Sequence, residues 1–196
     1  RTSLSIMMFA VVMAIISMLT LMSAPAFQTW ILNSRIRSTA ESMLSGLQQA
    51  KSEAVARNAR VRFQLTDTLD NACVLSPAGA NWVINLDPNA DPNEVVSLCG
   101  SAPNDAVAPF ILQSRPAAAG SGNTQVAASA ATLVFNGVGR LVPVPAGNIT
   151  IDITNPAGGN CIAGGGEMTC LRIVISAVGQ VPMCNPAFPA GDPQGC

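Results

Sequence analysis

Residues 4–58 read LSIMMFAVVMAIISMLTLMSAPAFQTWILNSRIRSTAESMLSGLQQAKSEAVARN, and this stretch decides the fold. No charged side chain occurs between Thr2 and Ser34, and residues 4–27 are almost continuously apolar. As a helix, these residues would be about 36 Å long, which exceeds the ~30 Å hydrocarbon core of a bilayer. The sequence therefore predicts a single-pass membrane anchor, and cleavage as a signal peptide near residues 23–26 is the alternative.

The stretch from residue 28 to residue 57 has the pattern of an amphipathic helix. Its apolar residues recur at steps of three and four, which places them on one helix face. Gly46 is the weak point, since glycine costs about 1 kcal/mol relative to alanine in an exposed helix. We expect the helix to end at Asn58, and Pro25 predicts a kink or a local loss of helix between the two halves. The apolar stripe comprises Leu32, Ile36, Ala40, Met43 or Leu44, Leu47, Ala50 and Ala54.

Residues 60–196 have the pattern of short strands separated by turns that contain Gly, Pro and Asn. The apolar stripe of the helix needs a partner surface, and an antiparallel sheet supplies one. The prediction is an α+β fold with an anchor at 1–27, an amphipathic helix at 28–59 and a β-rich domain at 60–196. The expected strands cover residues 60–65, 73–76, 82–86, 95–98, 110–113, 132–136, 149–154 and 171–176.

The composition argues against an enzyme. Of the 196 residues, 49% are hydrophobic and only 11% are charged, and the chain has no histidine and no tyrosine. The lack of histidine removes the commonest general acid–base residue and excludes Ser-His-Asp and Cys-His catalytic groups. No Lys-Ser or Lys-Thr follows the glycine-rich turns at 158–159 and 164–166, so no phosphate loop is predicted. We expect neither enzymatic activity nor a cofactor.

Six cysteines in an anchored, exported chain indicate disulfides, because oxidised pairs persist outside the cytoplasm. Six cysteines allow fifteen pairings, and we predict the sequential set. A cysteine metal site is not expected, because the chain contains no Cys-x-x-Cys pair. The predicted pairs are Cys73–Cys99, Cys161–Cys170 and Cys184–Cys196.

Residues 87–94 place oxygen ligands at alternate positions, as a calcium loop does. Asp87, Asn89 and Asp91 are the candidate ligands, but Pro92 and Leu98 stand where an EF-hand requires Gly and Glu. A polar hairpin turn is the favoured interpretation, and calcium is the weaker alternative.

Basic residues gather in the first third of the chain. Residues 1–62 contain seven Lys or Arg and two Asp or Glu, whereas residues 63–196 contain three Lys or Arg and nine Asp or Glu. This basic group predicts a helix face near the membrane that meets phospholipid and neighbouring subunits. Nucleic acid is the less favoured partner. The group comprises Arg35, Arg37, Lys51, Arg57, Arg60 and Arg62.

Four segments of the sequence resemble pilins and related proteins. The helix with Pro25 resembles the N-terminal helix of type IV pilins and type II secretion pseudopilins. Residues 47–58, LQQAKSEAVARN, resemble the FimT/GspH family of minor pilins, as do FNGVGR at 135–140 and VPMCNP at 181–186. The resemblance implies a pilin-like fold, in which a long helix packs on an antiparallel sheet.

The resemblance also assigns roles to residues near the N-terminus. Alignment on Pro25 makes Leu4 the mature terminus, with Ser3 in place of the usual glycine, and puts Met8 where the family has an assembly glutamate. The alternative is that Arg1 is itself the mature terminus, which by direct count puts Ser5 at the place of the glutamate. In the family, the glutamate is thought to neutralise a neighbour's terminal ammonium, which a thioether cannot do.

The function that the resemblance implies is a structural subunit of a type IV pilus-like filament or a type II secretion pseudopilus, with a minor subunit favoured over the major one. Its expected partners are other pilin subunits and, before assembly, inner-membrane lipid, with the β-rich domain in the periplasm or on the cell surface. Some family members are DNA receptors that use arginines near the C-terminal cysteines. Residues 176–196 contain no Lys or Arg, so DNA uptake is disfavoured.

Overall fold

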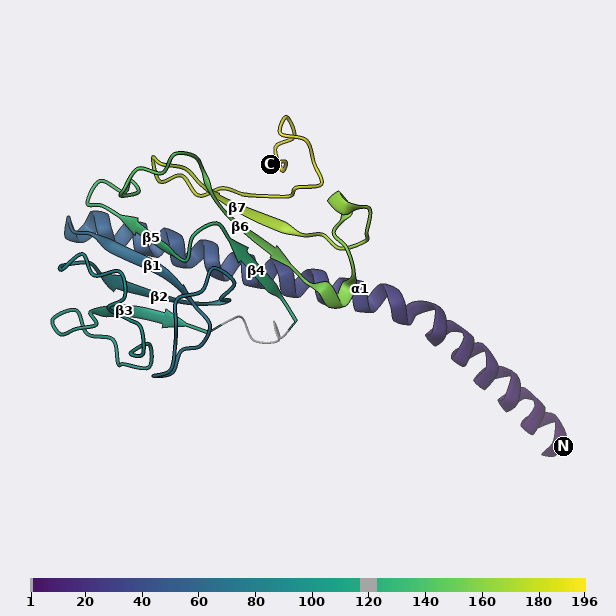
Figure 1. Cartoon of the computed structure of the whole chain (residues 1–196). Helices are drawn as coiled ribbons and strands as arrows, with labels where there is room; N and C mark the ends of the chain where they lie inside the picture. Colours follow the sequence, from purple (N-terminus) through teal and green to yellow (C-terminus); the bar gives the residue numbers. More distant parts are fainter. Residues whose placement is uncertain (1, 117–122) are drawn as a thin grey trace.

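A single helix, α1 (Thr2–Arg57), runs through the molecule and projects far beyond the globular part in this computed structural model (Figure 1). The structure describes residues 2–116 and 123–196, and it describes their side chains except at 2–5 and 19–26. The strands are β1 (Val61–Thr66), β2 (Asn81–Leu86), β3 (Ile111–Arg115), β4 (Gln125–Ala128), β5 (Thr132–Phe135), β6 (Ile149–Thr154), β7 (Leu171–Ile175) and β8 (Met183–Cys184). Two short 3-10 helices, η1 (Pro156–Gly158) and η2 (Ile162–Gly164), lie between β6 and β7.

The C-terminal half of α1 packs on two four-stranded antiparallel sheets, so the predicted α+β, pilin-like fold is confirmed. The first sheet has the order β3-β2-β1-β5 and the second β4-β6-β7-β8. Both sheets contribute inward-facing residues to one core against the helix, including Phe63 of β1 and Ile173 of β7. The sheets cover the apolar stripe of the helix, which is fully buried at Ile36, Ala40, Met43, Leu47, Ala50 and Ala54.

The helix continues without interruption through Pro25, so the predicted local loss of helix is absent. It changes direction where it leaves the sheets (Figure 1). Its end at Arg57 agrees with the prediction, and Asn58 adopts the left-handed conformation (φ 48°) that ends helices.

Strand β1 is buried on both faces. Its alternating sequence predicts one solvent-facing side, but every residue from Val61 to Thr66 is buried. Residues 87–110 fold over the outer face of the first sheet and form a second, smaller core there. Polar side chains of β1 therefore lie inside the protein. The second core contains Cys73, Val83, Val95, Cys99 and Ile111.

Two predicted strands are wrong and two were missed. Residues 73–76 form only an isolated bridge between Leu75 and Thr66, and residues 95–98 form turns around the buried Val95. Both segments lie near the Cys73–Cys99 disulfide, where their apolar residues fill the second core instead of a sheet. The short strands β4 and β8 carry too few alternating residues to stand out in the sequence.

Three disulfides close loops of the β-rich part in sequential order. Cys73–Cys99 holds the covering loop, Cys161–Cys170 closes the loop that contains η2, and Cys184–Cys196 ties the C-terminus to β8. Each crosslink restricts the unfolded chain and so stabilises the folded domain.

Candidate functional site

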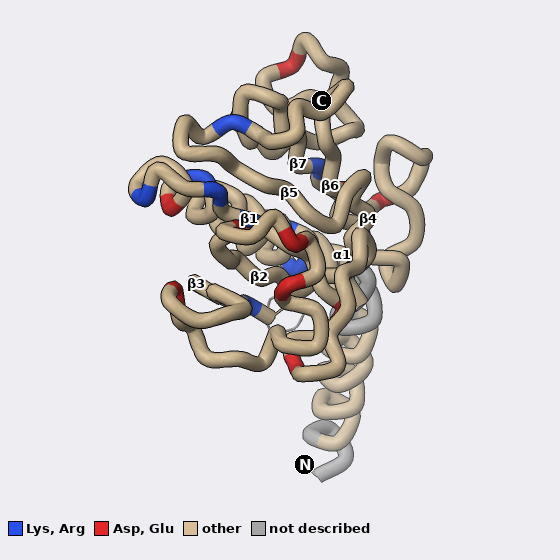
Figure 2. Tube along the Cα trace, turned by 60° about the vertical axis from the view of Figure 1, so that its left-hand side comes forward, with Lys and Arg blue, Asp and Glu red and all other residues tan. Residues whose placement is uncertain are grey.

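The N-terminal half of α1 is apolar on all sides and lies away from the sheets. From Ile6 to Met18, the large apolar side chains are 50–71% exposed, whereas the stripe in the second half is fully buried at six positions from Ile36 to Ala54. Residues 6–18 contain no charged side chain, and Figure 2 shows this part of the helix in tan. A helix that is apolar all round requires an apolar environment from outside the chain.

Four of the residues singled out for processing and assembly lie on this projecting half. Met8 is 69% exposed, and Ser3, Leu4 and Pro25 are helical positions whose side chains are not described. Arg1 lies outside the described residues. Within the parts of the chain whose side chains are described, no helix is apolar over a long enough stretch to span a membrane.

The basic group does not form one surface. Arg62 is buried, Arg37 pairs with Glu41 and Arg57 pairs with Glu53 and Asp105. Lys51 donates a hydrogen bond to the Gly179 carbonyl oxygen at 2.8 Å. Most of these cations are thus engaged within the chain, at separate places along α1 and β1.

The Arg57–Asp105 pair, with its 2.9 Å contact, ties the loop before β3 to the end of the helix. The hydrogen bond from Arg57 lowers the pKa of Asp105 below its usual range. A carboxylate with a lowered pKa in the folded state stabilises the fold above its unfolded pKa, and this contribution is lost as pH falls through the folded pKa.

We therefore expect Asp105→Asn to lower the urea midpoint of the full chain in detergent micelles at about pH 6, and to leave it unchanged at pH values below the folded pKa. In an Arg57→Gln background, Asp105→Asn should have no effect at either pH. An equal loss at both pH values would mean that the Asp105 side chain acts through packing and not through its charge.

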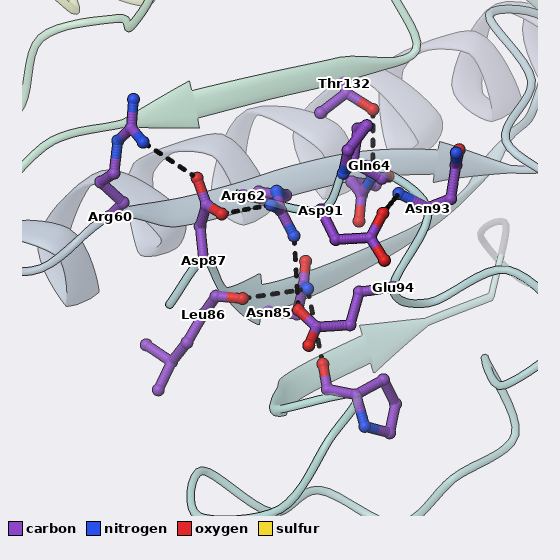
Figure 3. A network of polar contacts seen from close by, with 12 residues as sticks. Arg60, Arg62, Gln64, Asn85, Leu86, Asp87, Asp91, Asn93, Glu94 and Thr132 are labelled. Carbon is purple, nitrogen blue, oxygen red and sulfur yellow. Dashed lines mark hydrogen bonds and ion pairs between the residues drawn. The ribbon is translucent and has the colours of Figure 1, made fainter. Parts of the chain in front are cut away.

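A buried polar network lies on the outer face of β1 (Figure 3). The Arg62 side chain is 2% exposed and contacts Asp87, while its Nη1 lies 3.4 Å from Glu94 Oε2. Arg60 approaches the same Asp87 carboxylate at 3.8 Å, and Gln64 donates to the Pro92 carbonyl oxygen at 2.9 Å. The network joins β1 to the loop that covers it.

This network argues against the weaker calcium alternative and is consistent with the favoured polar turn. Asp87 is buried against Arg62 and Arg60, so its charge is already balanced, while Asn89 and Asp91 are exposed. Asp91 Oδ1 accepts a hydrogen bond from the backbone N–H of Asn93, as in an ordinary Asx turn. The residues in the described ranges 2–116 and 123–196 include no acidic, His or Cys cluster suited to a metal ion.

Two hairpin turns of the same design lie together beside the C-terminal part of α1, and the sequence analysis missed their relationship. The turns cover residues 136–140 and 176–180. In each turn, the side-chain oxygen of the first residue accepts a hydrogen bond from the backbone N–H of the fifth: Asn136 accepts from Arg140, and Ser176 accepts from Gln180. Each turn has a left-handed glycine, and a Cβ on Gly179 would collide with the Gly139 carbonyl oxygen. The signal was present as NGVGR and SAVGQ, which place Val-Gly at equal positions. The turns leave Val138 72% and Val178 54% exposed.

The model of the family described as type II transport protein GspH matches residues 39–179, which include most of the packed half of α1, strands β1 to β7 and the left-handed glycines of both hairpin turns. The chain belongs to the GspH family. GspH-family membership confirms the resemblance seen in the sequence. The chain is accordingly a pilin-like structural subunit of the family described as type II transport protein.

A solved structure with a TM-score above 0.5 supports the fold of this GspH-family chain. The type IV minor pilin FimU of Pseudomonas aeruginosa PAO1 is 19% identical, with a TM-score of 0.53 over 83% of this chain and 96% of that chain. A second crystal form of FimU gives 20% identity and a TM-score of 0.49 over 82% and 98%. The solution structure of Escherichia coli GspH is 14% identical, with a TM-score of 0.40 over 79% of this chain and 91% of that chain. No curated protein sequence matches the chain.

Proposed function

We propose that this GspH-family chain is anchored in a bacterial inner membrane by the apolar half of α1 and then enters a pilus-like filament as a minor subunit. The observation that carries the proposal is the contrast within one helix. Its second half buries an apolar stripe completely, whereas Ile6–Met18 exposes large apolar side chains on every side. Such a surface is stable in lipid or among other apolar helices.

Both environments fit the two stages of the proposal. Before assembly, residues 4–27 lie in the hydrocarbon core, and the domain with its three disulfides stays on the oxidising side. After assembly, the same side chains pack against the helices of neighbouring subunits. Met8 supports a minor position, because its thioether contributes apolar contact but no charge to neutralise a neighbour's ammonium.

Sheared filaments labelled with antibody against residues 63–196 test this proposal. We expect sparse labelling or labelling at one end, as for a minor subunit. Labelling along the whole length would make the chain a major subunit. Absence from filaments, together with a failure to co-purify with other pilins, would contradict a filament role.

A matched pair of variants tests whether the projecting half is the assembly element. Val12 is 51% exposed on that half, and Val74 is 49% exposed on the domain. Val12→Asp should lower the amount of chain in membranes and filaments by at least about tenfold, because a carboxylate deep in hydrocarbon costs about 2.5–3.5 kcal/mol. Val74→Asp should leave both amounts unchanged. Equal effects of the two variants would show that the apolar half has no special role.

A further inference from the structure

We infer that a cleft where α1 leaves the domain binds the phosphate group of a membrane phospholipid. The inference rests on the proposed membrane anchor and names the molecule that the chain binds beside it. The cleft has a volume of about 290 Å³ and opens between the helix and the segment that leads into β7. Its lining residues are Trp30, Asn33, Ser34, Arg37, Thr169 and Leu171.

The cleft is a fixed part of the fold. Asn33 Oδ1 accepts a hydrogen bond from the Thr169 N–H at 2.9 Å, which joins the helix to the start of β7. Leu171 is half-buried against the main core, so that wall is held in place by packing. Because both walls are tied together, the cleft does not depend on a mobile loop.

The chemistry of the cleft suits an anion that carries an apolar tail. Arg37 uses Nε to bind Glu41 at 2.9 Å, and within the described residues its two terminal nitrogens have no protein partner. The hydroxyl groups of Ser34 and Thr169 add two more donors. Of the described residues that line the cleft, none is acidic. Trp30 and Leu171 offer apolar surface beside these donors, as the glycerol and first methylene groups of a lipid require.

The position of the cleft selects a lipid as the source of the phosphate. The apolar run ends at Phe27, whose ring stacks on Trp30 with centroids 5.9 Å apart, and both side chains are more than 60% exposed. Exposed aromatic residues at the end of a spanning helix lie at the membrane–water interface. Ser34 is about 10 Å farther along the helix, so the cleft lies at the depth of the headgroups.

Photo-crosslinking of the full chain in nanodiscs tests the inference. The first probe is phosphatidylglycerol with a diazirine beside its phosphate, and the second carries the diazirine in the middle of an acyl chain. We expect the headgroup probe to label peptides with Thr169 and Leu171, and the acyl probe to label residues 6–18. Inorganic phosphate in excess should not reduce the headgroup labelling; displacement by it would overturn the assignment to lipid.

Two variants that each remove one positive charge provide the matched comparison. Arg37→Gln should lower headgroup labelling of Thr169 and Leu171 about fivefold, the factor that one basic side chain contributes near an anionic surface. Arg140→Gln, at an exposed arginine on a hairpin turn, should leave it unchanged. Equal labelling of the two variants would overturn the inference.

The two possible failures are distinguishable. Labelling of residues 6–18 by the acyl probe without headgroup labelling at the cleft would overturn the lipid site and leave the membrane anchor standing. A lack of acyl labelling would contradict the anchor itself. Trp30 gives an independent measurement, because the only other tryptophan, Trp82, is 3% exposed. The Trp30 fluorescence is the part of the signal that the Trp30→Phe variant lacks. Lipids with a nitroxide on the headgroup should quench it, and a lack of quenching would place Trp30 outside the interface.

Discussion

Arg62→Met is expected to lower the free energy of unfolding of the full chain in detergent micelles by about 3–5 kcal/mol. The arginine is 2% exposed and faces Asp87 and Glu94, whose side chains are 4% and 8% exposed. Its removal leaves two carboxylates under the covering loop, with only the half-exposed Arg60 near one of them. A buried charge without its partner loses hydration and gains nothing in return.

Two comparisons give this prediction its specificity. Arg172 pairs with Asp152 on the surface of the second sheet, with side chains 36% and 32% exposed, so Arg172→Met should cost less than about 1 kcal/mol. The combined variant Arg62→Met, Asp87→Leu, Glu94→Gln should recover most of the lost stability, because it also removes both carboxylates that Arg62→Met leaves under the covering loop. Urea unfolding followed by circular dichroism measures all three variants. If Arg62→Met lowers the free energy of unfolding no more than Arg172→Met does, water still reaches the network.

Gly46→Ala is expected to lower the free energy of unfolding by about 1–3 kcal/mol, as overpacking of a core does. An ideal Cβ at Gly46 would lie 2.8 Å from Phe63 Cε2 and 2.9 Å from two ring atoms of Trp82. The two rings form a tilted pair with centroids 5.7 Å apart, and both are buried under the helix. The missing side chain is therefore what lets the helix approach the first sheet.

The sign of this effect decides between helix propensity and packing. Propensity alone predicts that Gly46→Ala stabilises the helix by about 1 kcal/mol. Ser45→Ala is the control, because Ser45 directly precedes Gly46 on α1 and is exposed. Its replacement should change the free energy of unfolding by only about a few tenths of a kcal/mol. A stabilising Gly46→Ala would show that the aromatic pair can move aside at little cost.

The sequence predicted the elements that repeat a strong pattern. The stripe from Ile36 to Ala54 has helical spacing over many turns, and its burial is confirmed. Strands β1, β2, β5, β6 and β7 were expected within two residues of their observed ends, because each alternates or carries a run of β-branched residues. The structure also joins the cysteines in the sequential order that was expected.

The sequence misjudged residues whose neighbours come from distant segments. Gly46 looked like a weak helix position, and Asp87 remained a weaker candidate for a calcium ligand, because neither Phe63 nor Arg62 is near them in the chain. The paired hairpin turns were hidden for the same reason: NGVGR and SAVGQ stand 40 residues apart, and only the fold brings Gly139 against Gly179.

By itself, then, the sequence determined that a long apolar helix continues into an amphipathic one, that a β-rich part covers the second half, and that the chain resembles the GspH family. Periodic patterns and apolar runs act locally, so they survive without knowledge of the fold. Only the tertiary structure decided which polar residues of β1 are buried, why Gly46 carries no side chain, and where Trp30, Arg37 and Thr169 meet. These properties depend on contacts between segments far apart in the chain, which no local pattern encodes.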